Sequence, residues 1–278
     1  MKLPHQDEFV RIVRTLRPYL DQLVVVGAWC HRLLRHHARA TVPGFPPLMT
    51  EDADVATPER LRPSARSLDA LLVDGGFTAR LSGEGPRPIS RYVPVADPTG
   101  LYVEFIAPLR GSGYNRKGEL DDLLAVAGIS AQKLRYVELL LFEPWTLRLT
   151  GQLGFPSGGA ELPILVANPS SYLAQKVLSL HRRRSGPKRP KDALYIHDTL
   201  VMFGAELATL RDEAARVLQL LPPATRREFQ ALRVSLFQNS ALLVEAAMIA
   251  KATGRANPPS PDRLANVCMA GLAQMFEP

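Results

Sequence analysis

The chain changes character near residue 166, and this change restricts the folds that it can adopt. Before it, short apolar runs alternate with turns rich in glycine and proline; after it, a helical period continues almost to the end. Asn168-Pro169 marks the start of the helical part, because Asn is a good N-cap and Pro suits the first helical position. We therefore expect an α+β fold, with a mixed or antiparallel sheet and helices over residues 1–166 and an all-helical domain over residues 167–278.

Apolar periodicity predicts the elements of the first domain. The expected helices cover residues 5–18, 28–35, 67–73 and, within a loop-like region, 120–126. The expected strands cover residues 23–26, 49–56, 77–81, 91–95, 101–106, 136–142, 145–149 and 162–166. Glu143-Pro144 would turn a hairpin between residues 136–142 and 145–149.

Charge and cysteine content indicate the partner and the compartment. A net charge of +7 and a pI near 9.6 favour an acidic partner, with nucleic acid or nucleotide phosphate first. The two cysteines, Cys30 and Cys268, read as buried small hydrophobes in a reducing compartment. The polar N-terminus and the short apolar run over residues 23–30 predict no export signal and no membrane partner. We expect a soluble, cytoplasmic protein.

Two carboxylates stand two residues apart in the run Met49-Thr50-Glu51-Asp52-Ala53-Asp54-Val55-Ala56. Side chains on a strand alternate between faces, so Asp52 and Asp54 would project from the same face. Two acids held so close repel each other unless a cation lies between them, and Mg²⁺ accepts such hard oxygen ligands. The run therefore predicts a metal site or, alternatively, a solvated turn whose acids face water.

Two further features are expected in the same domain. Gly27 follows the apolar run at residues 23–26 and precedes a helical pattern, an arrangement whose backbone N–H groups can hold a phosphate. Glu104 is a single acid among apolar neighbours in residues 101–106. A buried acid is costly unless it is paired or bound to a metal, so Glu104 is either such a group or a solvent-facing residue of an edge strand.

A basic stretch lies at one helix–loop–helix junction of the second domain. Lys176 precedes it and Lys191-Asp192 ends it, and these groups could meet in one pocket. The stretch is either a contact for polyphosphate or RNA backbone, or a solvated face. Its candidate RNA-binding residues are Arg182, Arg183, Arg184, Lys188 and Arg189.

Taken in order, these features form a strand, a glycine, a helix, an acid-x-acid strand and a later acid. This order resembles the polymerase-β-like nucleotidyltransferase superfamily, and within it the AbiEii/MenT-type enzymes, known chiefly as bacterial toxins. Their lysine at the start of the helical half corresponds to Lys176, in Tyr172-Leu173-Ala174-Gln175-Lys176-Val177-Leu178. Their basic-Asp motif corresponds to Lys191-Asp192. The resemblance covers roughly residues 20–200.

The resemblance implies metal-assisted transfer of a nucleoside monophosphate. Asp52, Asp54 and Glu104 would hold Mg²⁺ (or Mn²⁺), and Glu104 would also deprotonate or orient an acceptor hydroxyl. Lys176 would complete the catalytic set by binding the triphosphate as a point charge. The nucleotide site would further include Gly27, Ala28, Thr50, Lys191 and Asp192, with Asp192 contacting the nucleotide or fixing Lys176.

The substrates and partners follow from the same resemblance. The donor would be an NTP such as ATP, GTP or CTP, and the acceptor a tRNA 3′ end. A toxin would imply an antitoxin protein as partner. Two departures stand out: Ala28 replaces the usual Ser or Gly, and Tyr195 replaces the second acid of the last motif, for which Asp198 is a substitute.

Two other functions remain open. A catalytically inactive module that binds nucleotide or RNA on the same scaffold would explain Ala28, although retention of all three acids argues against it. A metal-dependent nuclease or phosphotransferase could use the same acids, but the paired lysine motifs argue against that reading.

Overall fold

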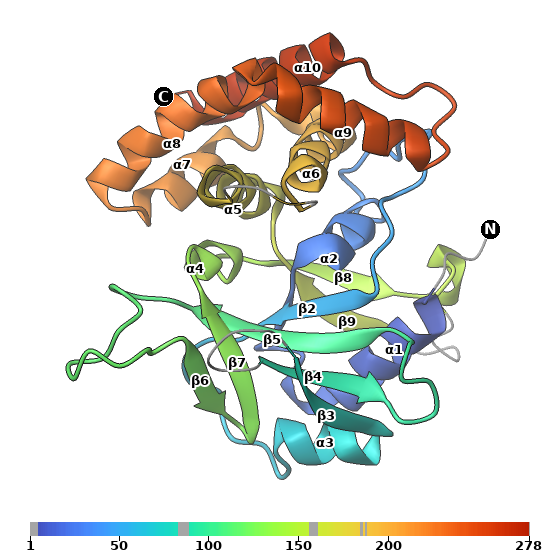
Figure 1. Ribbon diagram of the computed structural model, residues 1–278. Coiled ribbons are helices and arrows are strands. Elements are labelled where there is room, and N and C mark those ends of the chain that lie inside the picture. Colours follow the sequence, from blue (N-terminus) through green and yellow to red (C-terminus); the bar gives the residue numbers. More distant parts are fainter. Residues whose placement is uncertain (1–4, 83–88, 156–160, 184–185, 187, 278) are drawn as a thin grey trace. The chain divides into compact units, whose positions relative to one another are not determined.

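The computed structural model describes residues 5–82, 89–155, 161–183, 186 and 188–277. By its contacts the chain divides into two compact units. The sheet unit contains residues 1–33 and 49–167, and the helical unit contains residues 34–48 and 168–278 (Figure 1). The segment 34–48 thus belongs with the helical unit, although the domains expected from composition are continuous stretches, 1–166 and 167–278.

The sheet unit is built on a mixed sheet whose described part has nine strands, in the order β3-β4-β5-β2-β1-β9-β8, with β7 beside β5 and β6 beside β7. The strands β2 and β5, β1 and β9, and β5 and β7 pair in parallel, and the other pairs are antiparallel. The bounds are β1 Val24–Val25, β2 Asp52–Ala56, β3 Phe77–Ser82, β4 Ile89–Pro94, β5 Tyr102–Pro108, β6 Leu123–Val126, β7 Ile129–Leu134, β8 Trp145–Leu149 and β9 Leu162–Val166. The expected α+β class is confirmed.

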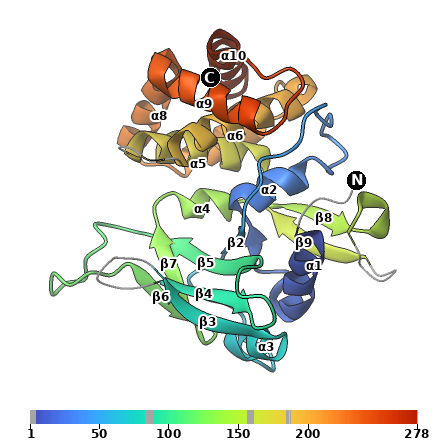
Figure 2. The same cartoon turned by 45° about the vertical axis from the view of Figure 1, so that its right-hand side comes forward.

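Helices α1 and α3 cover one face of this sheet. The helices of the unit are α1 Gln6–Thr15, α2 Gly27–Leu34, α3 Leu68–Asp74 and α4 Val137–Leu140. Arg11 of α1 lies over the ring of Phe77, and Asp69 of α3 accepts a hydrogen bond from the hydroxyl of Tyr92, so α1 and α3 pack on the same face (Figure 2). Buried side chains such as Val103 and Phe105 point to that face. The alternate residues of the central strands point to the other face.

Two expected elements of the sheet unit are wrong. Residues 120–126 are not a helix: Leu123–Val126 is strand β6, which pairs with β7 across a turn at Ala127 and Gly128, both with positive φ. Such a turn matches the twist of two antiparallel strands, and this outweighs the helical propensity of the leucines. Residues 136–142 are not a strand either: they contain the short helix α4, because β8 takes β9 as its antiparallel partner.

The helical unit is organised around α6. Its helices are α5 Pro169–Arg182, α6 Lys188–Met202, α7 Arg211–Gln219, α8 Pro223–Ser235, α9 Ser240–Ala252 and α10 Pro261–Phe276. Helices α5, α9 and α10 pack against α6, which buries most of its residues. The expected helix start is confirmed, since Asn168 Oδ1 accepts a hydrogen bond of 2.7 Å from the Ser171 amide, with Pro169 at the first position.

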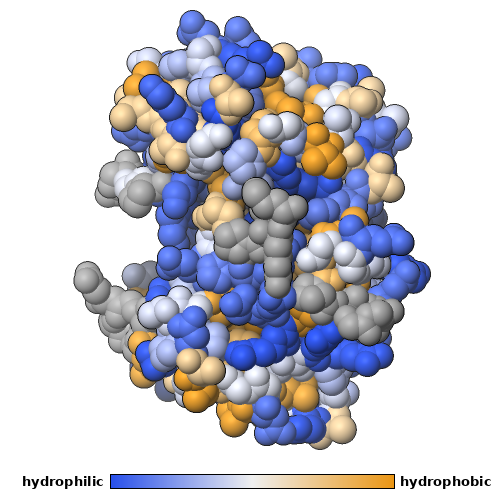
Figure 3. Space-filling model, turned by 90° about the vertical axis from the view of Figure 1, so that its right-hand side faces the viewer, coloured by the Kyte–Doolittle hydropathy of each residue, from blue (hydrophilic) through white to orange (hydrophobic). Residues whose placement is uncertain are grey.

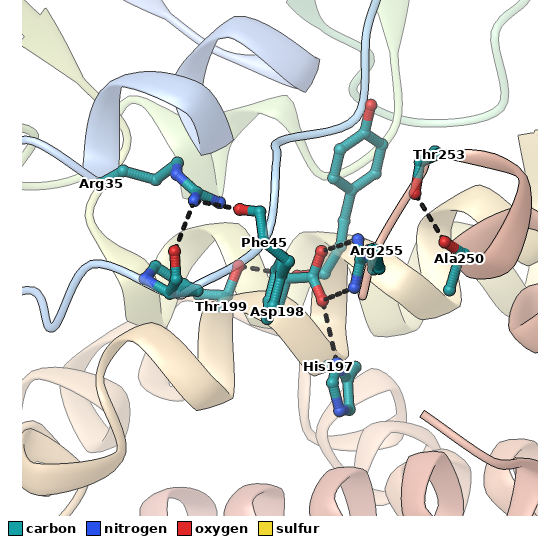
Figure 4. A network of polar contacts seen from close by, with 10 residues as sticks. Arg35, Phe45, His197, Asp198, Thr199, Ala250, Thr253 and Arg255 are labelled. Carbon is teal, nitrogen blue, oxygen red and sulfur yellow. Dashed lines mark hydrogen bonds and ion pairs between the residues drawn. The ribbon is translucent and has the colours of Figure 1, made fainter. Parts of the chain in front are cut away.

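Hydrogen bonds fold the segment 34–48 on itself, and a contact between Phe45 and Arg255 joins it to the rest of the helical unit. Arg35 donates hydrogen bonds to the carbonyl oxygens of Pro43 and Phe45, at 3.0 and 2.5 Å. The Arg255 guanidinium lies 4.1 Å from the Phe45 ring and forms a two-contact ion pair with Asp198 (Figure 4). Both members of that ion pair are fully buried, so the charges compensate each other away from water.

Hydrophilic residues predominate on the face drawn in Figure 3, with hydrophobic residues in small groups between them. Among the described helices, none is by itself long and apolar enough to cross a membrane; the bent pair Pro223–Gln238 and Ser240–Ala252 passes the test of length and composition only when taken together. Cys30 and Cys268 are buried free thiols, as expected.

Candidate functional site

The two aspartates of the acidic run lie on one face of β2. Ala53 and Val55 are buried on the opposite face, while Asp52 and Asp54 are only partly buried. Glu104 of β5 is the direct register partner of Asp54 in the parallel pair β2–β5. Side chains of register partners point to the same side of a sheet, so the three acids share the face that α1 and α3 leave open.

Thr50 orients the first of these acids. Its hydroxyl donates a hydrogen bond to Asp52 Oδ1, and the Asp52 amide donates one of 3.4 Å back to the same hydroxyl. This local loop restricts the Asp52 side chain at the start of β2. Thr50 was expected to contact nucleotide, and in this structure its contact is with Asp52.

The expected phosphate turn lies directly against the second acid. Gly27 begins α2 with a φ of +63°, and a Cβ at this position would overlap the carboxylate of Asp54. The amide of Val26 donates a hydrogen bond of 3.0 Å to the carbonyl oxygen of Asp54, which joins the turn to β2. Ala28 follows as a buried residue of the helix. Gly27 is thus required both by its φ and by the close approach of Asp54.

We expect Gly27→Ala to disturb the site more than an equally strained substitution elsewhere. A Cβ at a positive φ costs about 1–2 kcal/mol, and at Gly27 it would also push the Asp54 carboxylate aside. Gly76→Ala is the matched control, because Gly76 has a φ of +78° and a Cβ added there would meet no other atom within 4 Å. Chemical denaturation should show the larger loss of stability for Gly27→Ala. Equal losses for both variants would contradict the close contact.

Two residues that the sequence did not single out complete this face. Arg91 of β4 is the register partner of Glu104, and its Nε lies 2.7 Å from Glu104 Oε1. The Arg91 guanidinium also lies 4.7 Å from the ring of Tyr102, the register partner of Asp52. Burial, aided by the charges of Asp52 and Glu104, raises the pKa of Tyr102 to about 12, so its phenol stays protonated at neutral pH.

Sequence offered no signal for these two residues. Arg91 was one basic residue in an expected strand, and Tyr102 one aromatic residue among apolar neighbours. Their place depends on the registers of β4–β5 and β2–β5, which bring together residues from separate parts of the chain.

The donor chemistry of Asp52 and Asp54 fits a divalent cation. Mg²⁺ commonly takes one or two carboxylates, with water and substrate phosphates completing the octahedron. Within the described parts of the chain, no three His, Cys, Asp or Glu side chains are gathered as a ready metal site. Glu104 instead forms its ion pair with Arg91. The two aspartates therefore provide the one or two carboxylates that Mg²⁺ commonly takes. Glu104 lies in register beside Asp54 and is paired with Arg91.

The helical unit contains a second charged cluster. Lys176 of α5 donates a hydrogen bond of 2.7 Å to Asp192 Oδ1, and Arg183 forms an ion pair of 2.9 Å with Asp192 Oδ2. The Lys176 ammonium lies 5.5 and 5.1 Å from the ring centres of Tyr172 and Tyr195. Lys176 and Asp192 are buried, so they neutralise each other where water is excluded. The predicted lysine and acid are thus brought together.

The remaining predicted residues of the helical unit are mostly at the surface. Arg182, Lys188 and Lys191 are exposed and Arg189 is partly buried, while Arg184 lies outside the described residues. Asp198, considered as a substitute for the second acid of the last motif, is fully buried against Arg255 and His197. Its contacts are those of a structural residue.

The mixed sheet, the paired aspartates on a central strand and the glycine turn against them are the arrangement that the motifs lead us to expect of a nucleotidyltransferase. A family model described as nucleotidyltransferase matches residues 7–219, which is most of the chain. The protein belongs to this nucleotidyltransferase family.

A solved structure, an antigenic nucleotidyltransferase-like protein from Paracoccidioides brasiliensis, is similar to this chain. The match covers 86% of this chain and 91% of that one, with 17% sequence identity and a TM-score of 0.38. No curated protein matches the sequence.

Proposed function

We propose that this protein transfers a nucleoside monophosphate from an NTP to an acceptor hydroxyl, with Mg²⁺ or Mn²⁺ at Asp52 and Asp54. The observation that carries the proposal is the placement of both aspartates on one face of β2, with Glu104 in register on β5. Membership of the nucleotidyltransferase family supports the reaction class. The bound cation would neutralise charge on the triphosphate in the transition state.

The reaction forms one bond and breaks one. The acceptor oxygen attacks the α-phosphorus, and the bond from that phosphorus to the oxygen bridging toward the β-phosphate breaks. Pyrophosphate leaves with the electron pair of the broken bond. The proton of the acceptor hydroxyl passes to Glu104, the register partner of Asp54 on β5.

The other candidate residues would bind and orient. The Gly27 turn offers backbone N–H groups at the start of α2, next to Asp54. Thr50 would keep Asp52 in one orientation through its hydrogen bonds. Lys176 would bind triphosphate, with Asp192 holding its ammonium in place until the anion arrives.

For the acceptor we propose the 3′ end of tRNA, and for the biological role a toxin whose partner is an antitoxin protein. Support comes from the resemblance to AbiEii/MenT-type enzymes and from the exposed basic side chains of Arg182, Lys188 and Lys191. Such charges bind phosphate backbones through release of counterions, so tRNA binding should weaken steeply with salt.

The test is incubation of the protein with each α-phosphate-labelled NTP, Mg²⁺ and total tRNA. We expect label to enter RNA with at least one NTP, to require the divalent cation and to be absent when EDTA is added. Label that enters protein rather than RNA would keep the transferase and overturn the tRNA acceptor. Absence of label from every acceptor, with all four NTPs, would overturn the transferase.

The second candidate function is an inactive module that binds nucleotide or RNA. Two observations favour it: Glu104 is neutralised by Arg91, and Lys176 is neutralised by Asp192. This candidate predicts RNA binding that is unchanged by EDTA and by Asp52→Asn, together with no transfer of label in the test above.

A further inference from the structure

The ion pair between Arg91 and Glu104 stands at the edge of the proposed metal site. Arg91, Glu104 and Asp54 are successive register partners on β4, β5 and β2, so they form a row across three adjacent strands. Glu104 is therefore flanked by a cation on one side and by an acid on the other. Its side chain is 15% exposed and that of Arg91 is 38% exposed.

The Glu104 carboxylate contacts Arg91. Its Oε1 accepts the 2.7 Å contact from Arg91 Nε, and Arg91 is further held by the face of the Tyr102 ring. Throughout the described residues, Asp52, Asp54 and Glu104 do not gather into a three-ligand group. Like charges repel one another, so an ion pair with Arg91 is a favourable arrangement for a carboxylate that lies in register beside Asp54.

A divalent cation at Asp52 and Asp54 would change this balance. It offers Glu104 a double positive charge on the side opposite to Arg91, and it removes the repulsion from the two aspartates. Arg91 and the cation would therefore compete for the Glu104 carboxylate. The guanidinium also repels a cation that approaches Glu104.

We propose that Arg91 is a positioning residue that holds Glu104 on the β4 side of the site, so that Glu104 joins Asp52 and Asp54 only by exchanging Arg91 for the divalent cation. The biological role of this ion pair rests on the proposed function: the pair would keep Glu104, the carboxylate that activates the acceptor, away from the metal site until the metal is bound. The contact itself is a property of the apoprotein.

The test is Mn²⁺ binding to the full-length protein without nucleotide, measured by the loss of the free Mn²⁺ signal in electron paramagnetic resonance. Arg91→Gln removes the competing charge, and we expect Mn²⁺ to bind about two- to fivefold more tightly, the range of a partly exposed ion pair. Arg91→Lys keeps the charge and should bind within about twofold of the wild type. Thermal melting checks that each variant is folded.

Arg80→Gln is the matched control. Arg80 of β3 is the register partner of Arg91 on the same face, one strand farther from Glu104, and it is exposed. Its removal should leave Mn²⁺ affinity unchanged. The double variant Arg91→Gln/Glu104→Gln should lose the gain of the single variant, because the gain acts through Glu104.

Several outcomes would overturn the inference. These are no Mn²⁺ binding by any variant, equal or weaker binding by Arg91→Gln, an equal gain in Arg80→Gln, or a gain that persists without Glu104. Transfer of label, measured on the same preparations, separates this result from the proposed function. Tighter Mn²⁺ binding by Arg91→Gln without transfer of label supports the exchange of Arg91 for the cation and overturns the proposed transferase activity. Transfer of label without tighter Mn²⁺ binding supports the transferase activity and overturns the exchange.

Discussion

Asp54→Asn is expected to reduce the rate of nucleotide transfer by about a thousandfold or more, since loss of one metal-binding carboxylate removes several kcal/mol of transition-state stabilisation. The substitution changes the charge of Asp54 and almost nothing of its shape, so its packing against Gly27 is retained. The measurement is the initial rate of label transfer from the NTP at saturating Mg²⁺.

Glu51→Gln provides the matched control for this prediction. Glu51 lies in the same acidic run but is exposed, and its backbone carbonyl still accepts the hydrogen bond from Tyr102 after the change. We expect its rate to stay within about twofold of the wild type, because an exposed charge is screened by solvent and salt. Equal losses in both variants would mean that the run contributes only bulk negative charge, and an active Asp54→Asn would place the metal elsewhere.

Asp198→Ala is expected to lower the free energy of unfolding of the helical unit by about 3–5 kcal/mol, since it leaves a buried arginine without its counter-charge. Arg255 makes contacts of 2.9 and 2.6 Å to the two oxygens of Asp198, and the carboxylate also contacts His197 Nδ1 at 2.9 Å (Figure 4). Chemical denaturation, followed by helical circular dichroism, measures the loss.

Two variants make this prediction specific. Glu206→Ala removes a partly exposed ion pair to Arg39, which lies in the same segment 34–48, and it should cost clearly less because solvent screens that pair. The double variant Asp198→Leu/Arg255→Met should recover most of the stability, because it removes both buried charges together. A double variant as unstable as Asp198→Ala would show that packing, rather than the unpaired charge, sets the cost.

The best predicted parts of this protein are those encoded by neighbouring residues. The alternation of Asp52, Ala53, Asp54 and Val55 is sufficient to put both acids on one face, because the period of a strand is two. In the same way Asn168 and Pro169 encode the start of α5 within one turn. Such features need no knowledge of what lies on the next strand or helix.

The wrong predictions come from segments whose partners are distant or unusual. The leucines of residues 120–126 have helical propensity, but the positive φ of Ala127 and Gly128 closes a hairpin that only its pairing with β7 reveals. Residues 136–142 do not form the expected hairpin with residues 145–149, because β8 pairs instead with β9, which follows later in the chain. Propensity is a weak guide where a pairing supplies several hydrogen bonds.

The candidate site divides along the same line. The types and order of its acids, glycine and lysine were readable from the sequence, and so was the reaction class that the family match supports. The sequence could not show that Arg91 forms an ion pair with Glu104, or that Asp198 forms one with Arg255. For Asp192 it left two roles open, contact with the nucleotide or with Lys176, and the structure shows the contact with Lys176. The strength of an ion pair depends on the distance between its charges and on their burial, and the local sequence specifies neither.

The sequence by itself determined the local chemistry of this protein: a two-acid strand, a glycine turn, a capped helical half and an excess of positive charge. Only the tertiary structure decided the partners, through the registers of β4, β5 and β2 and through the burial of α6. It also assigned the segment 34–48 to the helical unit, where Arg35 and Phe45 join the buried cluster. The physical reason is that strand and helix periods act over a few residues, whereas ion pairs and strand registers form between residues that the chain brings together only when it folds.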